Sequence, residues 1–276
     1  MVNRRLPLSI VATAALTASV LAAAQQQAPN TRAGWPCGAR LDLSYFQIAE
    51  GSGGHLLLLA PEEIGDSATL LTALGEHSQT IARIAGAMQP GLHEFRVPID
   101  SSVESALFSI GVQCLQSVEV VRPSGAPAIG DDVTDLSNFR AERMLIVRRP
   151  EPGTWMLRVS GTGISGIVVQ ARSAIGITQL DFASGASAPF AAVPKAGVEN
   201  IMRIRMAGSP SDVSASLVNG TFQRVTDLPL ATDDAAGTLV SRFTPGVGAF
   251  RVLVTGRDAD GNAFLRVSAP LLTPAR

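Results

Sequence analysis

The chain has 276 residues, and its 22 Lys and Arg nearly balance its 23 Asp and Glu, which gives a formal net charge of −1. The charges are interspersed and no basic stripe with interleaved aromatic residues occurs, which argues against a nucleic-acid partner. The chain contains only two cysteines, too few for a cysteine-based metal site.

Residues 1–24 have the pattern of a signal peptide. Arg4 and Arg5 precede an uncharged apolar stretch, and Ala22–Ala24 fits the small-x-small rule for cleavage. Cleavage there predicts a secreted or periplasmic protein without a stable membrane span. The alternative is that the same stretch stays as an anchor, because its length is about that of a bilayer span. Residues 25–41 are then expected to form a linker.

Residues 42–88 predict a helix–strand–helix segment. A short helix is expected over 42–50, followed by a continuous apolar strand at His55–Leu59. Pro61 and the acidic residues after it favour the first turn of a second helix. Apolar residues at roughly helical spacing extend that helix to Ala87. This α/β piece is too small to bury a core of its own.

The period of the apolar residues changes to two from Gly91, which predicts a β-sandwich over 89–183. Its clearest strand carries Trp155, Leu157 and Val159 on one face. The glycines of Gly161–Gly166 predict a turn that returns the chain into a second apolar strand.

A second sandwich is expected over 190–273. Six or seven short strands follow Val198, with turn signals about every 8–12 residues, the spacing of an immunoglobulin-like sandwich. The Cys–Trp–Cys pattern of antibody domains is absent. The fold class is therefore mainly β: two consecutive β-sandwiches after a short α/β segment.

Several motifs resemble one family. Phe95–Ser102 (FRVPIDSS), Val120–Gly125 (VVRPSG), Pro150–Gly163 (PEPGTWMLRVSGTG) and Phe250–Ser268 (FRVLVTGRDADGNAFLRVS) are similar to the region after the von Willebrand factor A domain in hemicentin-like proteins. The resemblance implies a galactose-binding-like sandwich followed by an immunoglobulin-like one.

The resemblance also implies that residues 42–88 are a remnant of the von Willebrand A domain. The metal site of that domain needs an Asp-x-Ser-x-Ser motif. Asp100, Ser101 and Ser102 are followed by Val103 and by Glu104 where the second Ser would stand. Metal-dependent binding is therefore not carried over.

The two cysteines, Cys37 and Cys114, are a candidate disulfide pair. Export permits a disulfide, and closing a loop of this length stabilises a chain by about 4 kcal/mol in the chain-entropy treatment. The alternative is that Cys114, within an apolar alternation, is a small buried hydrophobe.

Two acidic loops are candidate ligand loops. The first contains Asp131, Asp132 and Asp135, and the favoured interpretation is a solvated loop rather than an ion site. The second has Asp258, Asp260 and Asn262, which are spaced like the first calcium ligands of an EF-hand loop. Its glycine comes too early and its twelfth residue is an alanine, so a hairpin turn is favoured.

No catalytic constellation is evident. His55, His77 and His93 have no accompanying Gly-x-Ser-x-Gly motif, and neither a catalytic residue nor a cofactor is predicted. Trp155 is expected in the core, whereas Trp35, beside Cys37, is expected to be exposed.

These observations predict an exported, non-enzymatic, adhesion-type protein that recognises a protein or cell-surface partner through sandwich loops and edges. The alternative is a carbohydrate-binding module with a glycan partner. A third class is a hydrolase with an unrecognised site.

Overall fold

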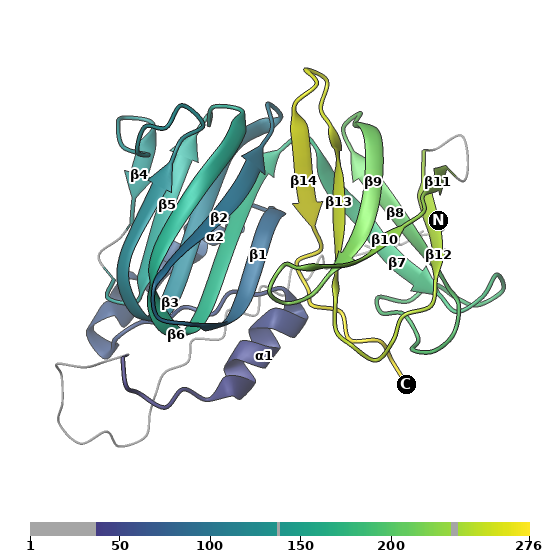
Figure 1. The fold of residues 1–276 in the computed structure, drawn as a ribbon, viewed down its shortest axis with the longest axis horizontal. Coiled ribbons are helices and arrows are strands. Elements are labelled where there is room, and N and C mark those ends of the chain that lie inside the picture. Colours follow the sequence, from purple (N-terminus) through teal and green to yellow (C-terminus); the bar gives the residue numbers. More distant parts are fainter. Residues whose placement is uncertain (1–36, 137–138, 233–236) are drawn as a thin grey trace, which may run out of the picture.

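The computed structural model describes residues 37–136, 139–232 and 237–276. Two β units lie side by side, a first unit of residues 79–173 and a second of residues 176–276 (Figure 1). An N-terminal segment, residues 37–75, carries the helices. The predicted signal peptide and Trp35 lie outside the described residues. Among the residues described, no helix has both the length and the apolarity to cross a membrane.

The N-terminal segment contains α1 (Leu43–Ser52), the 3-10 helix η1 (Pro61–Asp66) and α2 (Ser67–Gly75). Asp42 caps α1 by accepting a hydrogen bond from the backbone of Ser44. The strand expected at His55–Leu59 does not form. Instead, Leu57 and Leu59 pack with Leu70 of α2 against Leu107 and Met144 on the outer face of the first unit. Burial on that face, rather than strand pairing, removes this apolar run from water.

The helix expected up to Ala87 ends early, because Gln79–Met88 forms strand β1. Ala82 and Arg83 are both buried, although successive residues of a strand point to opposite faces. A strand that is covered on both faces loses the period-two alternation that identifies strands in a sequence. The change from helix to sheet therefore comes at Gln79 and not at Gly91.

The first unit is one antiparallel sheet in the order β1-β6-β3-β5-β4, with β2 also paired to β6. β1 and β2 follow one another along β6: Met88 pairs with Gly163, and Leu92 pairs with Ser160. Besides β1, its strands are β2 (Leu92–Ile99), β3 (Val103–Val121), β4 (Val133–Asp135), β5 (Glu142–Arg148) and β6 (Gly153–Ser173).

The glycines expected to form a turn lie inside the continuous strand β6, where the sheet bends. β3 has register shifts between Val112 and Cys114 and between Leu115 and Ser117, opposite this point. A Cβ on Gly161 would lie 2.8 Å from the Cys114 carbonyl oxygen, so only glycine permits the close approach. Bulges and glycine bend the long strands here, and the prediction of a turn is wrong.

The bend brings the two halves of the sheet around one core. Trp155 from one half and Phe108 from the other have ring centroids 5.5 Å apart, and both are buried. The Trp155 indole donates to the Glu151 carbonyl oxygen at 2.9 Å. Trp155 is therefore a core residue and offers no exposed platform for a sugar ring.

The second unit is a sandwich of two four-stranded sheets, β10-β9-β13-β14 and β11-β12-β8-β7. Phe182, Met202, Val252 and Phe264 pack between them. Its strands are β7 (Gly176–Ala183), β8 (Asn200–Ala207), β9 (Ser211–Val218), β10 (Arg224–Leu228), β11 (Ala231–Thr232), β12 (Leu239–Phe243), β13 (Arg251–Arg257) and β14 (Ala263–Val267).

β7 pairs with β8 and so belongs to the second unit, although the sequence placed it at the end of the first sandwich. The two units meet where β14 lies beside β1 and β2 (Figure 1). The Ala85 backbone donates to the Gly220 carbonyl oxygen at 3.0 Å across this boundary. One edge of the second unit is thus covered by the first, and the opposite edge, at β10 and β12, faces away from it.

Candidate functional site

The three histidines are spread over separate parts of the structure. His77 is buried, and its Nε2 lies 2.9 Å from the Ser105 hydroxyl while its Nδ1 lies 2.7 Å from the Ala73 carbonyl oxygen. This Ser–His pair is closed off from solvent. Burial, together with the nearby Arg83 charge, lowers the pKa of His55 to about 4. His93 contacts the Gln89 carbonyl oxygen at an exposed turn.

The carboxylates of the first acidic loop are paired separately. Asp132 accepts two hydrogen bonds of 2.9 Å from Arg122, which lower its pKa. Asp135 accepts one of 3.0 Å from Arg143. Asp131 is exposed. Within the described part of the chain, no three His, Cys, Asp or Glu side chains come together as a metal site.

The second acidic loop is the hairpin turn between β13 and β14, and it docks on the first unit. Asp258 accepts hydrogen bonds of 2.8 Å from both the backbone and the hydroxyl of Ser101. Burial alone would raise the pKa of Asp258, but these bonds and those from Asn262 lower it to about 2. The Ser101 hydroxyl also lies 2.5 Å from a carboxylate oxygen of Asp260. The loop that resembles a calcium site therefore joins the two units.

The structure brings together two motifs that the sequence treated separately, the Asp100–Ser102 turn and the Asp258–Asn262 loop. Next to them, Arg266 of β14 donates to Asp100 at 2.8 Å, and both side chains are buried. Arg266 also donates to the Ile175 carbonyl oxygen and the Ser173 hydroxyl. Sequence reasoning missed Arg266, whose only signal is a charged residue within an apolar strand.

Cys37 and Cys114 are joined by a disulfide with an S–S distance of 2.07 Å. Cys114 lies at the bend of β3, and Cys37 lies just before α1. The bond therefore attaches the start of the N-terminal segment to the first unit.

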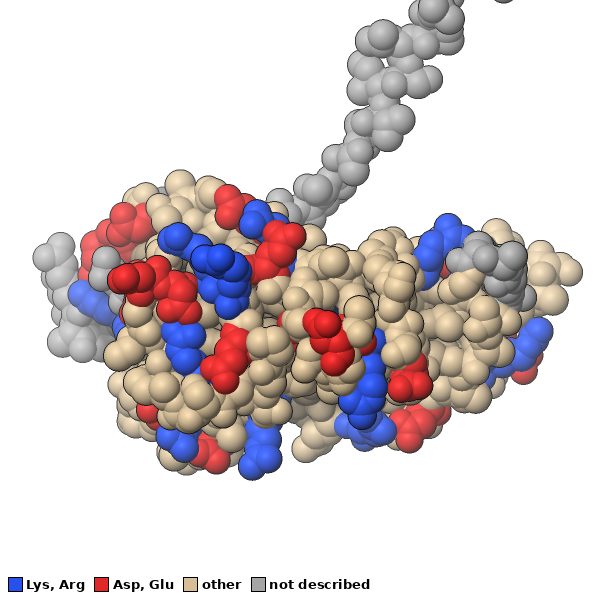
Figure 2. Space-filling view, turned by 90° about the horizontal axis from the view of Figure 1, so that it is seen from above, with Lys and Arg blue, Asp and Glu red and all other residues tan. Residues whose placement is uncertain are grey.

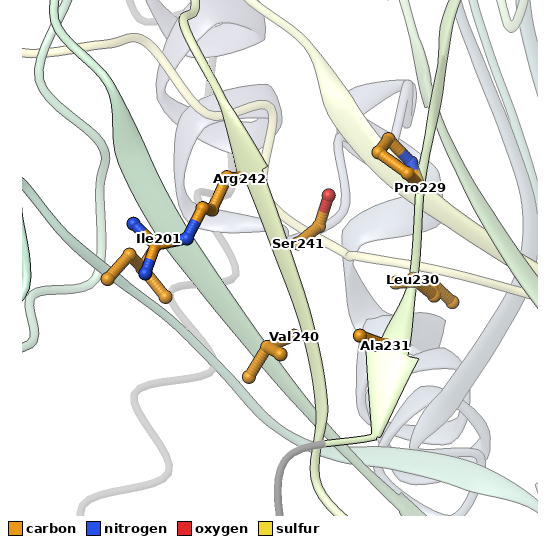
Figure 3. A pocket seen from close by; sticks show the side chains of 7 residues that line it. All are labelled: Ile201, Pro229, Leu230, Ala231, Val240, Ser241 and Arg242. Carbon is orange, nitrogen blue, oxygen red and sulfur yellow. The ribbon is translucent and has the colours of Figure 1, made fainter.

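A groove runs along the uncovered edge of the second unit. One hollow of about 360 Å³ lies between β12 and Pro229–Ala231 (Figure 3). A second, of about 650 Å³, shares Pro229 and Arg242 with it and continues along β10 to Gly248. Val225 on its wall is 62% exposed. The two hollows form one mostly apolar groove, called the edge groove below.

Ser241 gives the edge groove an unusual polar group. Its hydroxyl has no hydrogen-bond partner among the described residues, although the residue is only 3% exposed. The side chain points from β12 into the space beside Pro229, while Arg242 points to the other side (Figure 3). A buried hydroxyl without a partner costs about 1–3 kcal/mol, and a bound group placed in the groove could remove that cost.

The strand edges beside the groove are largely free. Among the described residues, β11 pairs with β12 at Leu239 and Val240, and β10 is the outermost strand of its sheet. Free edges present backbone N–H and C=O groups to any strand that can reach them. The exposed pair Arg224–Asp227 on β10 is the kind of feature that limits indiscriminate edge pairing.

Comparisons with known proteins give weak similarities. No family profile matches the chain. Mouse hemicentin-1 is 23% identical over 239 residues, and human hemicentin-1 is 22% identical over 236 residues. Each alignment covers 82% of this chain but spans only 4% of the relative.

Two solved structures were also matched. The tandem Ig repeats of Dlar are 13% identical and cover 72% of this chain and all of that chain, with a TM-score of 0.25. A Bifidobacterium dentium beta-glucuronidase is 8% identical and covers 64% of this chain and 39% of that chain, with a TM-score of 0.23. Neither similarity carries weight for function at these TM-scores.

Proposed function

We propose that this chain is an exported, non-enzymatic, adhesion-type protein that binds a protein partner at the edge groove of its second unit. The observation that carries the proposal is the free strand edge beside a mostly apolar groove with the unpartnered, buried Ser241 hydroxyl. A strand edge offers backbone hydrogen bonds, and an apolar groove accepts alternate side chains of an extended segment.

Three further features support export and adhesion. The first 24 residues have a signal-peptide pattern, and the Cys37–Cys114 disulfide suits an oxidising compartment. The weak similarity to hemicentin-1 extends over most of the chain. Lys and Arg are intermingled with Asp and Glu over the face in Figure 2, which favours a partner recognised by shape and hydrogen bonding over one recognised by a single sign of charge.

The proposal is tested by photo-crosslinking in the native envelope. A benzoyl-phenylalanine at Val225, on the groove wall, should crosslink one defined protein. The matched control carries the same probe at Leu92, which is 63% exposed on the first unit, and should not crosslink that protein. Adding Ala231→Arg, which places a long charged side chain in the groove, should abolish the crosslink.

Two outcomes contradict the proposal. Equal crosslinking from Val225 and Leu92, unaffected by Ala231→Arg, would place recognition elsewhere on the molecule. Reproducible binding to one defined sugar on a glycan array would favour the carbohydrate-binding alternative.

A further inference from the structure

Two buried arginines, one from each β unit, meet at a single carboxylate. Arg83 lies on β1 and Arg251 on β13, and their side chains are 2% and 0% exposed. The Oε1 atom of Glu50, on α1, accepts a hydrogen bond of 2.9 Å from Arg83 Nε. The Oε2 atom of the same carboxylate accepts from Arg251 Nη2. One acidic group thus joins three separate parts of the chain.

The two arginines, and not the carboxyl end of α1, favour an anion at this point. Arg83 donates its remaining hydrogen bonds to the carbonyl oxygens of Ala49, Gly53 and Gly54, at and just beyond the carboxyl end of α1. Arg251 Nε donates to the Ala269 carbonyl oxygen at 3.3 Å, and Arg251 Nη1 has no partner among the described residues. Two guanidinium groups therefore share one carboxylate.

The contacts around Glu50 hold α1 against the second unit. The Leu271 backbone donates to the Glu50 carbonyl oxygen at 2.7 Å. Gly53 ends α1 with φ 75°, and a Cβ there would lie 2.8 Å from the Ala269 Cβ. Glycine is required here both by the backbone conformation and by this close approach.

We propose that Arg83 and Arg251 form a carboxylate-binding socket shared by the two units, which Glu50 fills in cis and which fixes how the units are oriented. Without the carboxylate, two guanidinium charges face each other in a buried place, where repulsion is only weakly screened. The units then separate at this side unless another carboxylate enters. The socket is independent of partner binding at the edge groove.

The first test measures the distance between the units. Spin labels on unnatural amino acids at Leu92 and Val225, both exposed, leave the native disulfide untouched. Glu50→Gln should shift or broaden the distance distribution, because it removes the negative charge between the two arginines. An unchanged distribution in folded Glu50→Gln would overturn the proposal.

Glu63 provides the matched control. It is also a buried glutamate of the N-terminal segment, but it accepts from the backbones of Ala60 and Arg140, away from the second unit. Glu63→Gln is expected to lower stability and to keep the wild-type distance distribution. A similar broadening in both variants would show that loss of any buried glutamate loosens the molecule, and would contradict the socket.

The second test restores the carboxylate from solution. Glu50→Ala leaves space that formate can occupy, so sodium formate should raise its melting temperature more than sodium chloride at equal ionic strength. Glu63→Ala should show no such difference. If Glu50→Ala folds poorly, its refolding yield in the two salts is the readout. Equal responses of the two variants would overturn the proposal.

Discussion

The two edges of the second unit differ in how their charged and polar side chains are paired and buried. At the edge that faces the first unit, buried charges are paired, as in Arg266–Asp100 at 2.8 Å. At the far edge, the ion pair Arg242–Glu199 is exposed and the Ser241 hydroxyl is buried without a partner. The buried charges of the first edge have partners of opposite sign, whereas the unpartnered Ser241 hydroxyl is neutral and lines the groove that we propose as the binding site.

The largest expected effect comes from breaking the buried pair at the junction. Arg266→Met leaves the Asp100 charge buried without its partner and should cost about 3–5 kcal/mol in free energy of unfolding. The matched control is Arg242→Met at the far edge, whose side chain is 60% exposed and which should cost less than about 1 kcal/mol.

Urea unfolding measures both changes. The double variant Arg266→Met/Asp100→Asn should recover part of the loss, because the uncompensated charge is gone. Equal costs for Arg266→Met and Arg242→Met would remove the contrast between the two edges.

Removing the disulfide measures how much the covalent attachment of the N-terminal segment to the first unit contributes to stability. Replacing both Cys37 and Cys114 by Ala opens a loop with a sequence separation of 77 residues and should lower the free energy of unfolding by about 2–4 kcal/mol. Thermal unfolding with and without reductant measures this. Reductant should lower the melting temperature of the wild type and leave that of the double variant unchanged.

Asp258 tests the contribution of the docked hairpin. Asp258→Asn weakens hydrogen bonds to a charged acceptor and should cost about 1–2 kcal/mol at pH 7. Because the folded pKa of about 2 lies below the usual 3.8, this stabilisation is present above pH 4 and is lost as the pH falls towards 2.

Unfolding of Asp258→Asn and the wild type at pH 7, 4 and 2.5 should therefore show a difference that shrinks with acid. Asp227→Asn, in an exposed pair on β10, should change stability little at any of these pH values. A constant difference across the range would mean that the Asp258 charge is irrelevant to docking.

Glu142 is a buried carboxyl outside the junction and responds to pH in the opposite direction. Burial raises its pKa to about 8, against hydrogen bonds from Ser109 and the Leu58 backbone that lower it. The folded chain keeps this proton when the unfolded chain, with a pKa near 4.5, has lost it. Stability should therefore fall as the pH rises between these values, by about 1.4 kcal/mol per pH unit.

Glu142→Gln cannot ionise and should flatten this fall, which urea unfolding at pH 6, 7 and 8 would detect. If wild type and variant keep a constant difference over that range, the side chain does not titrate there. The comparison separates a buried carboxyl with an arginine partner, such as Asp100, from one without.

The sequence determined the parts of this fold that follow from local patterns. Short alternating strands with regular turns predicted the second sandwich from Leu239–Phe243 onward almost strand by strand. Alternation also placed Trp155 in the core. These succeed because one buried face imposes a period of two on a strand, whatever its partner is.

Only the tertiary structure decided where the long strands bend and which charged residues form pairs. Gly161 has a place in β6 because β3 passes close by, which no local pattern reveals. Gln79–Met88 resembles a helix in sequence because both of its faces are covered. Glu50 lies 33 residues from Arg83 and 201 residues from Arg251. Such contacts depend on the complete packing of the chain. In the sequence, each of these residues appears only as a charged residue within a largely apolar segment.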